Sequence, residues 1–116
     1  MENELYLSGE ERKTILIADD EEMLRRMYKL LAEQMGYRTI LACDGAEALE
    51  LFRSRQDEIH LILLDYCMPE MDGLVTFQEL KKLQPDVKVI LSSGYDREES
   101  CRHFAEKGIA GFLQKP

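Results

Sequence analysis

The chain has 116 residues, of which 45% are hydrophobic and 33% are charged, and its formal net charge at pH 7 is −8. This length and balance predict a single soluble globular domain that buries a core without disulfides or structural metals. The acidic excess argues against direct contact with nucleic acid or an anionic membrane. Three cysteines without metal-ligand spacing indicate a reducing compartment, so we expect a cytoplasmic protein.

Short apolar runs alternate along the chain with segments of helical periodicity. Residues 1–13 are polar and predict a lead-in or linker, followed by one domain over residues 14–116. The apolar runs predict five strands, over residues 14–18, 37–42, 59–64, 87–92 and 110–113. The periodic segments predict four helices, over residues 21–34, 46–55, 73–83 and 97–106. This alternation predicts an α/β fold, a doubly wound parallel sheet with helices on both faces.

Local signals mark the ends and faces of these elements. Gly36 follows the first helix in the usual position of a C-cap. Asp44 and Gly45 predict a turn before the second helix. Leu24 and Leu31 lie on the stripe of the first helix that we expect to face the core.

Charged residues stand at the carboxyl ends of three predicted strands. Asp19 and Asp20 follow the first strand, Asp65 follows the third, and Lys115 follows the last. If these strands are parallel neighbours, the four side chains meet at one edge of the sheet, where such folds bind ligands. Three carboxylates and one ammonium suit a divalent cation such as Mg²⁺ together with a phosphoryl group.

These residues also have plainer structural explanations. Asp19 and Asp20 could cap the helix that follows them. Asp65 could be a solvated loop carboxylate. His60 lies within a predicted strand and is expected to be structural, and Asp72 is expected only to begin the third helix.

Four elements, in this order along the chain, are similar to the response-regulator receiver domain of two-component signal transduction. They are Asp19-Asp20, the segment 65–73, Ser93-Gly94 and Lys115-Pro116. The resemblance covers the chain from residue 14 and implies a flavodoxin-like fold with sheet order 2-1-3-4-5. It also implies a phosphoacceptor in a phosphorelay, not an enzyme, although the domain assists its own phosphotransfer and dephosphorylation. Segments 91–95 and 112–116 are similar to receivers fused to hybrid sensor histidine kinases.

The resemblance assigns a role to each charged residue. Asp65 would accept a phosphoryl group from the phosphohistidine of a histidine kinase and become a 4-aspartylphosphate. Asp20, Asp65 and the backbone carbonyl of Cys67 would bind Mg²⁺, and Asp19 would do so directly or through water. Lys115 would pair with a phosphoryl oxygen.

The resemblance also implies a switch. Ser93 would hydrogen-bond the attached phosphoryl group, with Ser92 as the fallback for this role. Phe112, three residues before Lys115, matches the aromatic switch residue of the family, but it could simply be a core residue. Movement of Ser93 towards the phosphoryl group would let Phe112 turn from exposed to buried and so change a protein–protein surface.

Receivers normally continue with a fifth helix, which these 116 residues do not contain. We therefore expect a receiver that stops before this helix, and the apolar surface left on the first and fifth strands could drive formation of a homodimer. The expected partners are a sensor histidine kinase or a histidine phosphotransfer domain, with no direct contact to nucleic acid or membrane. The effector domain cannot be read from the sequence.

Two other functions compete with this interpretation. A small phosphohydrolase with an aspartyl-phosphate intermediate usually carries Asp-x-Asp after its first strand, whereas here that strand ends in Asp19-Asp20 and no cap domain is present. An interaction module that has lost phosphorylation usually lacks an acidic residue or the lysine, and this chain retains all of them.

Overall fold

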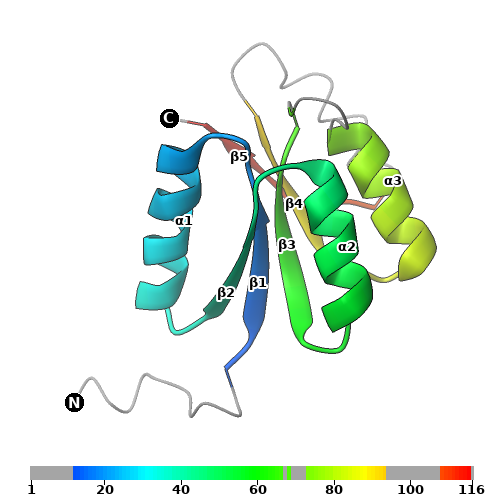
Figure 1. Cartoon of the computed structure of the whole chain (residues 1–116), viewed down its shortest axis with the longest axis horizontal. Coiled ribbons are helices and arrows are strands. Elements are labelled where there is room, and N and C mark those ends of the chain that lie inside the picture. The colour runs from blue at the N-terminus through cyan, green and yellow to red at the C-terminus, as the bar shows by residue number, and fades with distance from the viewer. Residues whose placement is uncertain (1–11, 67, 69–72, 94–107, 116) are drawn as a thin grey trace.

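The computed structural model describes residues 12–66, 68, 73–93 and 108–115 (Figure 1). The five strands form one parallel sheet in the order β2-β1-β3-β4-β5, which confirms the predicted fold and strand order. The predicted helix over residues 97–106 lies outside the described residues. The elements in chain order are β1 Thr14–Ala18, α1 Glu22–Gln34, β2 Arg38–Ala42, α2 Gly45–Arg55, β3 Ile59–Asp65, α3 Gly73–Leu83, β4 Val89–Ser93 and β5 Gly111–Gln114.

The sheet is covered by α1 on one face and by α2 and α3 together on the other (Figure 1). Because successive side chains of a strand point to opposite faces, β1 contributes to both cores. Its Ile17 packs in one cluster with Tyr28 of α1. Its Leu16 belongs to the larger cluster that also contains Phe52 of α2 and Phe77 of α3. All of β1 is buried, as the continuous apolar run predicted.

The helix ends follow from local hydrogen bonds. Gly36 has a φ of +94°, the left-handed conformation that commonly ends a helix, and this confirms its predicted role after α1. Asp44 caps α2 instead of forming a separate turn, because its carboxylate accepts a hydrogen bond of 2.8 Å from the Glu47 amide. The carboxylate of Glu47 in return accepts a hydrogen bond of 2.7 Å from the Cys43 amide. The predicted turn is thus the start of the helix, which begins at Gly45.

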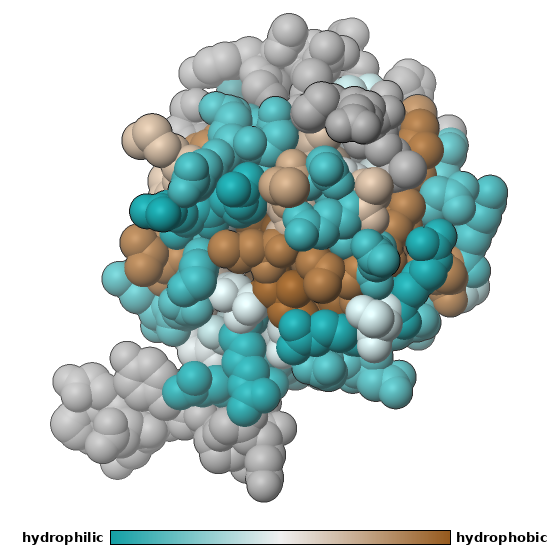
Figure 2. Space-filling view, in the orientation of Figure 1, coloured by the Kyte–Doolittle hydropathy of each residue, from teal (hydrophilic) through white to brown (hydrophobic). Residues whose placement is uncertain are grey.

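The outer surface mixes polar and apolar side chains. Figure 2 shows apolar side chains in the middle of one face with polar side chains around them.

Leu31, predicted to face the core, is 49% exposed. It lines an open hollow of about 500 Å³ together with Met35 of α1 and Phe112 and Leu113 of β5. Within the described parts of the chain, no helix is long and apolar enough to cross a membrane.

Truncation of the central core should destabilise the fold strongly. Leu16 of β1 is fully buried on the face of the sheet that α2 and α3 cover, so we expect Leu16→Ala to lower the free energy of unfolding by about 2–5 kcal/mol. Leu30 on α1 is 60% exposed, so Leu30→Ala should change it by less than about 0.5 kcal/mol. Urea denaturation measures both variants, and equal losses would contradict this assignment of the core.

Candidate functional site

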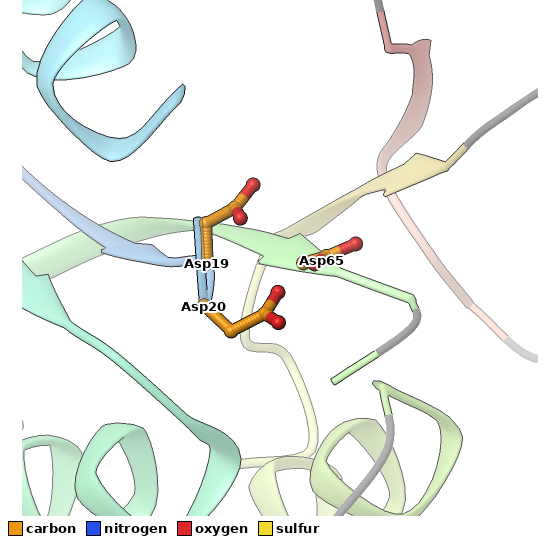
Figure 3. A group of neighbouring side chains, drawn as sticks. All are labelled: Asp19, Asp20 and Asp65. Carbon is orange, nitrogen blue, oxygen red and sulfur yellow. The ribbon is translucent and has the colours of Figure 1, made fainter. Parts of the chain in front are cut away.

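Three carboxylates meet at the carboxyl edge of the sheet. Because β1 and β3 are parallel neighbours, with Ala18 paired to Leu64, the residues that end them lie side by side. Asp19, Asp20 and Asp65 each present an oxygen, and these oxygens all lie within 4.8 Å of one another. Figure 3 shows the carboxyl groups of Asp19 and Asp20 leaning towards Asp65. Asp19 and Asp65 are buried, and Asp20 is exposed.

Asp19 is held by backbone contacts on each side. Its amide donates to the carbonyl of Ala42 at 3.1 Å, and its own carbonyl accepts from Nη1 of Arg25 at 2.7 Å. Its Oδ1 accepts from the amide of Glu21 at 2.9 Å, so the helix-capping explanation is partly right, although Glu21 itself is the N-cap. Its Oδ2 is buried and accepts no hydrogen bond from the described residues. Burial raises the pKa of Asp19, and the Glu21 amide and the charge of Lys115 only partly offset this.

Lys115 places its ammonium among these acids. Its Nζ lies 3.1 Å from Oδ2 of Asp65, 3.2 Å from Oε1 of Glu21 and 3.7 Å from Oδ2 of Asp19. Its backbone amide donates to the carbonyl of Ser93 at 2.7 Å, which ties the end of β5 to β4. Burial alone would lower the pKa of Lys115. The hydrogen bond and charge of Asp65 and the charge of Asp19 together outweigh burial, so the net pKa lies above its usual value. The side chain therefore stays an ammonium at neutral pH.

The structure also adds Glu21, which the sequence analysis placed only at the start of a helix. The available signal was its position directly after Asp19 and Asp20. Local periodicity could not reveal a contact with Lys115, because the two residues are 94 positions apart.

Ser92 and Ser93 end β4, and Phe112 lies on β5 three residues before Lys115. Ser93 is buried at the end of β4. The hydroxyl of Ser92 lies 3.3 Å from the hydroxyl of Tyr28 on α1, so Ser92 is engaged with that helix. Phe112 is 39% exposed on β5. The phosphoryl-binding and switch roles of Ser93 and Phe112 stay predictions, and Cys67, with its predicted carbonyl ligand, lies outside the described residues.

The donor set of this edge fits a hard divalent cation. All the side-chain ligands on offer are carboxylate oxygens, and Mg²⁺ is usually bound by one or two carboxylates together with water and phosphate oxygens. The buried Oδ2 of Asp19 accepts no hydrogen bond from the described residues, so this oxygen can bind a cation. One ammonium among several carboxylates leaves excess negative charge, which a cation would reduce.

Comparison with known proteins gives one consistent result. The sequence profile of the response regulator receiver domain matches residues 15–116. The sensor kinase CckA of Brucella abortus is 36% identical over 103 residues, and the match covers 89% of this chain but 11% of that protein. The two-component response regulator ARR22 of Arabidopsis thaliana is 33% identical, with coverage of 88% of this chain and 72% of that protein.

A solved structure extends the comparison to the site. The response regulator protein TrrA of Thermotoga maritima, solved in complex with Mg²⁺ and BeF, superposes with a TM-score of 0.79 at 32% identity. The match covers 90% of this chain and 87% of that one. The acidic group of Asp19, Asp20 and Asp65 is typical of the Mg²⁺ site of such domains.

Removal of the buried Asp19 charge should stabilise the metal-free protein at neutral pH. Because the pKa of Asp19 is raised above 3.8, the folded state binds its proton more tightly than the unfolded chain. Burial of the ionised Asp19 carboxylate therefore lowers the free energy of unfolding only where the group is ionised. This loss is absent below about pH 3.8, grows as the pH rises towards the pKa of Asp19 in the folded protein, and is complete above that pKa. In EDTA we expect Asp19→Asn to be more stable than wild type at pH 7, with a gain that disappears in acid.

Urea denaturation at a series of pH values measures this difference. The asparagine keeps an Oδ1 acceptor for the Glu21 amide, so that hydrogen bond is retained. Asp57→Asn, which removes the same charge from an exposed turn, is the matched control. A gain in Asp19→Asn that is the same at pH 3 and pH 7 would contradict the assigned cause.

Proposed function

Because the chain belongs to the response regulator receiver domain family, we propose that Asp65 accepts a phosphoryl group in a two-component phosphorelay. The domain is a signalling phosphoacceptor and not a turnover enzyme. The observation that carries the assignment is the position of Asp65 at the end of the central strand β3. There it is buried, 3.1 Å from the ammonium of Lys115, and grouped with Asp19 and Asp20.

The acidic group is the proposed Mg²⁺ site. Asp20 and Asp65 would bind the ion directly, Asp19 directly or through water, and the carbonyl of Cys67 would add a further ligand. Bound Mg²⁺ would neutralise charge shared between the carboxylates and the donor phosphate. Support comes from the all-oxygen donor set and from the buried Oδ2 of Asp19, which accepts no hydrogen bond from the described residues.

The transfer itself needs an anionic nucleophile and an anionic donor to meet. A carboxylate oxygen of Asp65 attacks the phosphorus of a phosphohistidine, so that an O–P bond forms, the P–N bond breaks, and the electron pair leaves with the imidazole. Lys115 stays protonated beside Asp65 and pairs with a phosphoryl oxygen. The hydroxyl of Ser93 donates a hydrogen bond to another oxygen of the phosphoryl group. The engagement of Ser92 with Tyr28 supports Ser93 for this role.

Phosphorylation would be read out through the surface near β5. Phe112 is 39% exposed and pairs in register with Leu91 on β4, two residues before Ser93. Movement of Ser93 towards the phosphoryl group would let Phe112 turn inward, so the output is a changed protein–protein contact.

The partners follow from the same chemistry. The domain is expected to be cytoplasmic, and the expected donor is a sensor histidine kinase or a histidine phosphotransfer domain. The chain spans 11% of its kinase relative and 72% of its response-regulator relative. Fusion to a hybrid kinase and formation of a homodimer are parts of this proposal.

A small phosphodonor tests the acceptor directly. In acetyl phosphate and Mg²⁺, we expect intact-protein mass spectrometry to show a gain of one phosphoryl group, and EDTA should abolish it because uncompensated carboxylates repel the donor. Asp65→Asn should show no gain, and the control Asp57→Asn should behave as wild type. An adduct of equal yield in Asp65→Asn would contradict the assignment.

A further inference from the structure

Glu21 is a fourth carboxylate at this edge, outside the group of Asp19, Asp20 and Asp65. Its Oε1 lies 3.2 Å from Nζ of Lys115. Its backbone is fixed on both sides, because its amide donates to Oδ1 of Asp19 and its carbonyl accepts from the amide of Arg25 at 2.9 Å. The main chain at the junction of β1 and α1 therefore sets the starting point of the side chain that reaches Lys115.

The contact is not explained by the needs of the helix. Glu21 is the N-cap of α1, but its side chain makes no capping hydrogen bond in the described part of the chain. The exposed ion pairs elsewhere among the described residues join neighbours three or four positions apart. The pair with Lys115 instead joins the start of α1 to the end of β5, across the carboxyl edge.

Glu21 contacts the Lys115 ammonium from the side that faces solvent. The side chains of Asp65 and Asp19 are 0% and 2% exposed, whereas that of Glu21 is 59% exposed. An ammonium has three donors, and here the carboxylates of Asp65 and Glu21 lie within hydrogen-bond distance of it, while that of Asp19 is farther away at 3.7 Å. A phosphoryl oxygen that arrives from solvent would approach the ammonium on its exposed side, where the Glu21 carboxylate lies. The contact with Glu21 is the one that water and salt screen, because the Glu21 side chain is 59% exposed.

We propose that Glu21 is a positioning residue that holds Lys115 before phosphorylation and competes with the phosphoryl group for its ammonium. The inference rests on the proposed role of Asp65 as phosphoacceptor. Glu21 then weakens the attachment of the phosphoryl group by two routes, because it occupies a donor of Lys115 and adds a negative charge beside an anion. Glu21 thereby sets how readily the domain is phosphorylated, although it does not touch the reacting atoms.

Trifluoroberyllate, a tetrahedral anion that mimics an aspartyl phosphoryl group, tests this at equilibrium. In Mg²⁺ we expect Glu21→Gln to bind it about two- to fivefold more tightly than wild type, the range expected for loss of one exposed ion pair. Glu21→Ala should show the same gain. Both gains should shrink in high salt, since screening already weakens the contact in wild type. Isothermal titration calorimetry measures the affinities, and a purely structural role would not give this salt dependence.

Glu22→Gln is the matched control. Glu22 is the next residue and has a 65% exposed side chain, but it pairs with Arg26 on its own helix at 3.1 Å. Its substitution changes the net charge equally and should leave the affinity unchanged. Wild-type affinity in both Glu21 variants, or an equal gain in Glu22→Gln, would overturn the competition. Failure of wild type to bind the anion would overturn the proposed function, and this inference with it.

Discussion

The burial of two carboxylates beside one ammonium is the constraint on which the carboxyl edge depends. Asp19 and Asp65 are each 1% exposed, so water does little to screen their charges from each other. Lys115 approaches both, at 3.7 and 3.1 Å, and its amide is tied to β4. The parallel order β1-β3-β4-β5 makes this possible, because it brings strand ends that are distant in sequence to a single edge.

The arrangement costs stability and provides function. A core built for stability alone would not bury Asp19, whose pKa is raised by that burial, with an Oδ2 that accepts no hydrogen bond from the described residues. The same carboxylate oxygen suits a cation, which would supply opposite charge and bind the oxygen directly. Lys115 offsets only part of this negative charge, and Glu21 contacts the same ammonium from the solvent side.

The architecture and most of the site could be predicted from the sequence, because both depend on local patterns. Continuous apolar runs ending in Asp19, Asp65 and Lys115 fix which residues reach the carboxyl edge, and the alternation of strands and helices fixes the class of sheet. The contact of Glu21 with Lys115 could not be predicted, since it depends on the path of a side chain across the edge. The exposure of Leu31 was not predicted either, because helical periodicity defines an apolar stripe but not whether another element packs beside the helix over the sheet.

The most direct test of the central claim is to locate the phosphoryl group in the protein. Reduction of the acetyl-phosphate-treated protein with borohydride converts an aspartyl phosphate to homoserine, and tandem mass spectrometry of its peptides identifies the position. The buried ion pair of Asp65 with Lys115 predicts that the conversion occurs at Asp65 and requires Mg²⁺ during phosphorylation. Conversion at Asp19 or Asp20, or at no aspartate, would contradict the assignment of this edge as a phosphoacceptor site centred on Asp65.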